Sequence, residues 1–80
     1  MPKYPNTVSW QEAEYVARIT GFVLRNHAGT SHRQYKKEGA GVLTIPTYKE
    51  ISVNKGHLFA AMLRQMGIGK SEFFSILNKK

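Results

Sequence analysis

Three short β-like segments occupy the middle of this chain, and the links between them are too short to hold a helix. The segments are Phe22–His27, Ser31–Lys36 and Val42–Ile45, and Pro46 closes the last one. Parallel strands need a crossover of about a dozen residues or more, which neither link provides. The sequence therefore predicts an antiparallel meander.

Helical patterns flank the meander on both sides. Before it, Ser9 and Glu12 form a capping box, Val8 can staple onto Ala13, and Gly21 offers a left-handed stop. These signals predict a first helix from about Ser9 to Thr20.

After the meander, Thr47–Asn54 is expected to be a loop or a frayed edge. Asn54 is expected to cap a second helix, Lys55–Met66, which Gly67 ends. The residues expected to form the buried side of this helix are Leu58, Ala61, Met62 and Gln65 or Met66.

A short third helix should begin at Gly69 or Lys70. The residues that it has to bury are Phe73, Phe74, Ile76 and Leu77. The order of helix, three strands, helix and short extra helix predicts an α+β fold with the helices on one face of the sheet. Eighty residues make one domain, 1–80, with its core at about 9–77.

Charge is the strongest signal in the composition. Twelve Lys and Arg stand against five acidic residues, giving a net charge of +7 and a pI near 10.0. A surplus this large on a small surface favours a polyanionic partner such as RNA. A basic protein that docks on an acidic protein is the alternative.

Several classes of protein are disfavoured. The chain has no cysteine, which removes disulfides, thiol nucleophiles and Cys-based zinc sites. His27, His32 and His57 lack the spacing of metal ligands, so neither a metal nor another cofactor is expected. No apolar run suits a membrane helix or a signal peptide, which favours the cytoplasm.

The hairpin of the first two strands carries the residues best suited to chemistry. Alternation allows a register in which Leu24 and Tyr35 share the face toward the helices. The competing register would set Arg25 opposite Arg33, a like-charge pair that costs stability. In the preferred register, the open face carries Arg25, His27, His32, Gln34 and Lys36.

Such a face suits RNA cleavage without a metal. The ribose 2′-hydroxyl can attack its own phosphate if a base takes its proton, an acid protonates the leaving oxygen, and cations stabilise the charge. Histidine titrates near neutral pH and can serve as acid or base. His32 is the catalytic candidate, and Arg25, Arg33 and Lys36 are candidates for holding the phosphate.

The start of the second helix is another candidate phosphate site. Free backbone N–H groups and the helix dipole attract phosphate at a helix N-terminus. Lys55 adds a charge there, and Gly56 allows close approach of a backbone. The competing interpretation is an ordinary capped helix with a solvated lysine.

Several short motifs, in this order and spacing, resemble the HicA family of bacterial and archaeal toxins. They are Gly21–Leu24, Gly29–Arg33, Leu43–Pro46, Lys55–Gly56 and Leu63–Ile68. The similarity covers about residues 9–77. It implies a fold like the double-stranded-RNA-binding domain and an mRNA endoribonuclease activity. It also implies that His32, after the Gly-Thr-Ser turn, is essential. The residues expected to contact RNA are Arg25, His27, Ser31, Arg33, Lys36, Lys55 and Gly56.

The resemblance further implies a HicB-type antitoxin protein as the partner that neutralises the toxin. The chain departs from the family pattern at Tyr48, where members often carry a second histidine, and at His57, where a small polar residue is commoner. The acid/base partner of His32 therefore remains open. A non-catalytic RNA-binding module and a basic interaction protein are the rival functions.

Overall fold

The structure, a computed structural model, describes residues 4–26 and 32–79. Its elements are β1 (Thr7–Val8), α1 (Trp10–Ile19), β2 (Val23–Asn26), β3 (His32–Lys36), β4 (Leu43–Pro46), β5 (Ile51–Ser52), α2 (Leu58–Met66) and α3 (Lys70–Asn78). The fold is therefore α+β, and the order of helix, meander and two helices is the predicted one.

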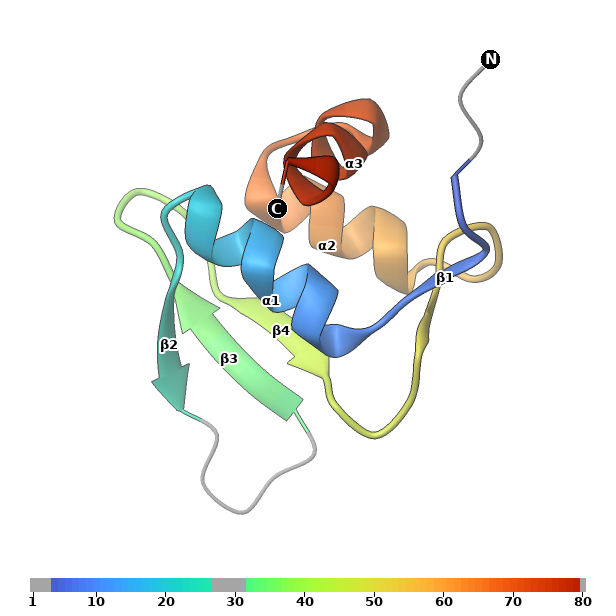
Figure 1. Cartoon of the computed structure of the whole chain (residues 1–80). Helices are drawn as coiled ribbons and strands as arrows, with labels where there is room; N and C mark the ends of the chain where they lie inside the picture. The colour runs from blue at the N-terminus through green and yellow to red at the C-terminus, as the bar shows by residue number, and fades with distance from the viewer. Residues whose placement is uncertain (1–3, 27–31, 80) are drawn as a thin grey trace.

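The meander is confirmed as an antiparallel sheet with strand order β2-β3-β4 (Figure 1). Leu24 lies opposite Tyr35, as in the preferred register. Beyond that pair, the register shifts, because the next pair joins Asn26 to Gln34. Arg25 is thus the extra residue of β2, without a partner in the ladder.

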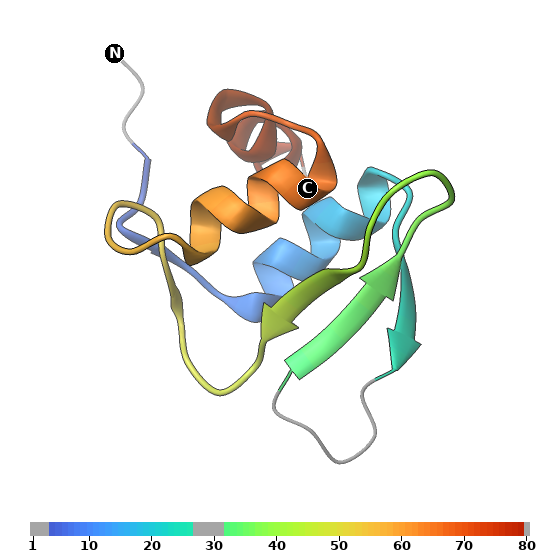
Figure 2. The ribbon, with the colours of Figure 1, turned by 180° about the vertical axis from the view of Figure 1, so that it is seen from behind.

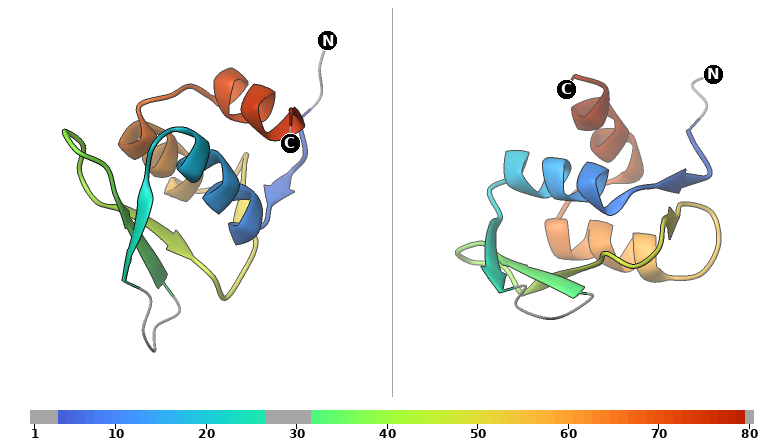
Figure 3. Two further views of the ribbon diagram at one scale, coloured as in Figure 1. Left: turned by 60° about the vertical axis from the view of Figure 1, so that its left-hand side comes forward. Right: turned by 60° about the horizontal axis from the view of Figure 1, so that its bottom comes forward.

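The helices lie on one side of this sheet, as predicted (Figures 2 and 3). Helix α1 contacts β4, α2 contacts β4 and β5, and α3 packs on α1. Among residues 4–26 and 32–79, the core between these layers contains fourteen buried apolar residues: Val8, Ala13, Val16, Ala17, Phe22, Tyr35, Leu43, Ile45, Ile51, Phe59, Met62, Met66, Phe73 and Phe74.

The helix ends follow the sequence signals at four places. The N–H of Glu12 donates to Ser9 Oγ (3.1 Å) and the N–H of Ser9 donates to Glu12 Oε1 (2.8 Å), which completes the capping box. Gly21 and Gly67 have φ angles of 103° and 76°, which favour glycine. Helix α3 begins after Gly69 and buries Phe73 and Phe74.

The predicted start of the second helix is wrong. Helix α2 begins at Leu58, after His57, whose side chain makes no capping hydrogen bond. Ser52 Oγ accepts from the N–H of Lys55 (3.0 Å), and Gly56 turns the chain at φ 74°. A side-chain hydrogen bond and a left-handed residue thus stop the helical path from reaching Lys55.

Asn54 does not cap the helix because its side chain makes tertiary contacts. Its Nδ2 donates to Asn6 Oδ1 (3.2 Å), and its Oδ1 accepts from Lys70 Nζ (3.4 Å). The buried side of α2 also differs from the prediction. Met62 and Met66 are buried as expected, but Phe59 is buried as well and Gln65 is exposed.

The segment expected as a loop or frayed edge contains the strand β5. It pairs antiparallel with β1, with Val8 opposite Ile51 and both side chains buried. The N–H of Val53 also donates to the carbonyl of Asn6 (2.8 Å). This pairing joins residues more than forty positions apart, so a local pattern does not reveal it.

Replacing Ser9 by Ala tests the capping box. We expect Ser9→Ala to lower the free energy of unfolding by about 1 kcal/mol, because the N–H of Glu12 at the start of α1 loses its acceptor, Ser9 Oγ. Urea unfolding measures the change. Ser75→Ala, at an exposed position within α3, is the control and should be close to neutral. An equal effect of both variants would contradict a role for the cap.

Candidate active site

His32 is the first residue of β3 and lies opposite Pro46 at the end of β4. Its side chain is exposed and lines a pocket of about 430 Å³. The pocket therefore lies where the middle strand begins and the last strand ends. The face expected to carry His32 is not simply an open sheet surface, because α2 forms one wall of this pocket.

The pocket combines an apolar wall with a few polar groups. Helix α2 supplies Leu58, Ala61, Met62 and Gln65, β4 supplies Thr44 and Pro46, and Tyr48 and Lys49 follow β4. These eight residues and His32 include no carboxylate. The arrangement can hold a flat, partly apolar group and a negative charge beside an imidazole.

Tyr48 lies directly against His32. The two ring centroids are 5.4 Å apart, and the ring planes meet edge to face at 67°. Lys49 Nζ lies 5.5 Å from the centroid of the Tyr48 ring. The family whose motifs the sequence resembles often carries a second histidine at the position of Tyr48. In this chain, a phenol therefore lies beside His32.

Gln65 joins α2 to the free edge of β4. Its Oε1 accepts from the backbone N–H of Thr44 (3.3 Å). Because a backbone N–H can only donate, this contact assigns the oxygen of the amide to Thr44 and leaves the amide nitrogen as a donor. This hydrogen bond holds α2, which forms one wall of the pocket, against β4.

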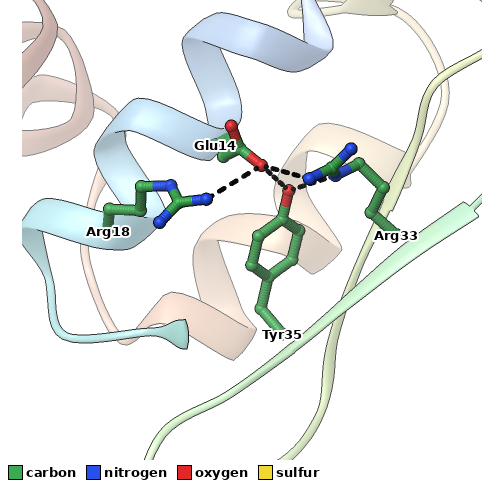
Figure 4. A network of polar contacts seen from close by, with 4 residues as sticks. All are labelled: Glu14, Arg18, Arg33 and Tyr35. Carbon is green, nitrogen blue, oxygen red and sulfur yellow. Dashed lines mark hydrogen bonds and ion pairs between the residues drawn. The ribbon is translucent and has the colours of Figure 1, made fainter. Parts of the chain in front are cut away.

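A polar network fixes the middle strand to α1 (Figure 4). The Tyr35 hydroxyl donates to Glu14 Oε2 and accepts from Arg33 Nε (3.0 Å). Glu14 also pairs with Arg33 at 3.1 Å and with Arg18 at 3.6 Å. The Arg33 guanidinium lies 4.9 Å from the centroid of the Trp10 ring, a cation–π distance.

The network places Arg33 on the helix side of the sheet, where alternation with His32 predicts it. Its guanidinium already has a carboxylate, a phenol and an indole as partners. Arg33 therefore supports the strand that carries His32, and it does not line the pocket.

The other predicted RNA contacts are spread over the surface. Arg25 and Lys36 are exposed on β2 and β3. Lys55 is exposed and lines a separate pocket of about 300 Å³, and Gly56 is exposed beside it, outside the helix. The helix start assumed for this phosphate site is thus wrong, whereas phosphate binding by Lys55 and Gly56 stays a prediction. His27 and Ser31 lie outside the described residues.

The sequence interpretation missed Lys49 and Gln65 and gave Tyr48 no role. A usable signal was the antiparallel pairing of β3 with β4. It brings the residues after Pro46 next to the start of β3, so an aromatic and a cation there become neighbours of His32.

Comparison with protein-family models, with curated proteins and with solved structures found no match for this chain. Within residues 4–26 and 32–79, no helix has the length and apolar content needed to span a membrane. The same residues contain no group of three or more His, Cys, Asp or Glu side chains that could hold a metal ion.

The network makes the stability of the fold depend on pH. Burial, reinforced by the hydrogen bond to Glu14, raises the pKa of Tyr35 from 10.0 to about 12, although Arg33 acts in the opposite direction. The folded state therefore retains the phenol proton more tightly than the unfolded chain. This contribution to stability is complete below pH 10 and is lost as the pH rises toward 12.

We expect the melting temperature to fall more steeply between pH 10 and pH 12 in the wild type than in Tyr35→Phe. The two proteins differ only in the hydroxyl of residue 35, so the difference between their profiles isolates Tyr35. Ultraviolet absorbance of tyrosinate provides a second measurement, in which the variant should lack the ionisation near pH 12. Identical pH profiles for the two proteins would show that folding does not raise the pKa of Tyr35.

Proposed function

We propose that this chain is a toxin endoribonuclease of the HicA kind that cleaves mRNA without a metal ion, with His32 as general acid or base. The observation that carries the proposal is the position of His32. It lines a pocket of about 430 Å³ together with a lysine and a tyrosine and without a carboxylate. A site of this composition suits an anionic substrate and acid–base chemistry.

The proposed reaction needs few groups. Removal of the proton from a ribose 2′-hydroxyl lets its oxygen attack the adjacent phosphorus. Protonation of the departing 5′-oxygen then releases the downstream fragment of the RNA. His32 performs one of these proton transfers, since an imidazole can serve as a general acid or a general base. Lys49 stabilises the negative charge that develops on the phosphorane oxygens. The need for a 2′-hydroxyl makes RNA, and not DNA, the substrate.

The distribution of charge supports an RNA partner. The strands β2 and β3 expose the cations Arg25 and Lys36, and β2, β3 and β4 contain no acidic residue. On α1, Glu12 is used in the capping box and Glu14 in the network with Arg33. The excess of basic residues over acids thus favours contact with phosphate at the sheet.

The finer fold assignment is part of the same proposal. The order α1-β2-β3-β4-α2, with an antiparallel meander and helices on one side, is the order implied for a fold like the double-stranded-RNA-binding domain. We assign the chain to that fold and the protein to the cytoplasm, where mRNA is available as substrate.

Replacing His32 tests the activity. We expect His32→Ala to reduce cleavage of single-stranded RNA by about 100-fold or more, as for the loss of a general acid or base. Cleavage by the wild type should be unchanged by EDTA. His57→Ala is the matched control, because His57 is also exposed and its side chain makes no capping hydrogen bond.

The rate of product formation on gels is compared at equal protein concentration, and circular dichroism checks the fold. Full activity of His32→Ala would refute the catalytic assignment. RNA binding without cleavage by the wild type would instead indicate a non-catalytic RNA-binding module.

The proposed partner is a HicB-type antitoxin with an acidic contact surface. Complementary charge accelerates association with a basic toxin and selects the correct partner. We expect the antitoxin to cover His32 and to slow hydrogen exchange of backbone amides in β2, β3 and the segment around Tyr48. It should also raise the melting temperature, because it binds only the folded state. Protection confined to α3, with inhibition intact, would rule out direct blockage of the site.

A further inference from the structure

We propose that the pocket beside His32 binds one unstacked nucleobase of single-stranded RNA, which stacks on Tyr48 and receives a hydrogen bond from Gln65. The inference rests on the proposed ribonuclease function and assigns its specificity site. The pocket volume of about 430 Å³ lies within the range of roughly 300–1,000 Å³ typical of small-molecule sites.

The apolar wall suits the faces of a base. Leu58, Ala61 and Met62 of α2 and Pro46 of β4 line one part of the pocket. These side chains offer contact area without hydrogen-bond requirements, so they accept a flat ring. A phosphate or a free carboxylate would gain little from them.

Tyr48 is the stacking partner. Among the described residues, it is one of three large apolar or aromatic side chains that are exposed, and 59% of its surface is accessible. Its edge-to-face contact with His32 holds the ring at the mouth of the pocket. Exposed aromatic side chains are the usual platforms for unstacked bases in proteins that bind single-stranded RNA.

Gln65 supplies a directional contact. Its oxygen is engaged by the N–H of Thr44, so the group that it can offer to a ligand is the amide nitrogen, a donor. A base that presents a carbonyl oxygen or a ring nitrogen at this position is accepted. A base that presents an exocyclic amino group there meets a second donor and is disfavoured.

Lys49 and His32 extend the site from a base to a nucleotide. Lys49 Nζ lies 5.5 Å from the ring centroid of Tyr48, so a cation stands beside the stacking platform. The phosphate of the bound nucleotide can reach this cation while the ribose faces His32. The base within the pocket then determines which phosphodiester lies at the imidazole. Because a paired base is not available for such insertion, the substrate is single-stranded.

Binding of short 2′-fluoro RNA tests the proposal without cleavage, because these oligonucleotides lack the attacking hydroxyl. Fluorescence anisotropy gives the Kd for four hexanucleotides, each made of one base, at fixed salt. We expect the wild type to discriminate among the four. Tyr48→Ala should weaken the preferred one by roughly 5- to 100-fold. Tyr48→Phe, which retains the ring, should restore most of the lost binding.

Gln65→Glu provides the sharper test. Its carboxylate can still accept from the Thr44 N–H, but it has no donor to offer to a base. We expect the order of preference among the four bases to change. Gln11→Glu on α1 introduces the same charge at another exposed position and should weaken all four to a similar, small extent. Ile19→Ala, which truncates another exposed apolar side chain, is the control for Tyr48→Ala.

The outcomes separate the two proposals. If Tyr48→Ala binds as tightly as Ile19→Ala and Gln65→Glu behaves like Gln11→Glu, the base pocket is refuted, even where His32→Ala abolishes cleavage. If the pocket variants alter base-selective binding but the wild type cleaves no RNA, the base pocket stands and the nuclease proposal fails.

Discussion

Tyr35 is fully buried at the centre of the middle strand, and its hydroxyl reaches across the interface to Glu14 on α1. A buried phenol and a carboxylate are each costly without a partner, so the geometry that satisfies both is strongly favoured. Arg33 completes the network and stacks on Trp10. These contacts define which face of β3 meets the helices. A slip of β3 by one residue would remove all of them.

The orientation of β3 determines the side of the sheet to which its first residue, His32, is directed. With Tyr35 and Arg33 toward α1, His32 is directed to the other side, opposite Pro46. The chain that leaves β4 then brings Tyr48 into ring contact with His32. Helix α2 closes the site because Gln65 bonds the edge of β4. One partly buried polar network thus supports an exposed site that contains none of its members.

The same arrangement separates the charges of the protein by role. The acid of the network is shared by two arginines, Arg18 and Arg33, on the helix side. The cation beside the pocket, Lys49, belongs to a segment after the sheet. The charges of the network and the cation beside the pocket are therefore on different elements. Under the proposed function, a variant of Lys49 should alter RNA binding with little effect on stability, whereas a variant of Glu14 should affect mainly stability.

Local signals in the sequence determined the meander, the capping box at Ser9 and the stop at Gly67, because each depends on residues a few positions apart. They also placed His32 on the side of β3 opposite Tyr35, since side chains alternate along a strand. Only the tertiary structure decided where α2 begins, which strand pairs with β1, and that Tyr48 lies beside His32. The contacts that decide these features join distant segments: Asn54 binds Asn6 and Lys70 instead of capping a helix. Whether such a residue caps a helix or binds distant partners depends on which set of contacts is stronger in the folded protein. The local sequence shows the possible cap but not the distant partners.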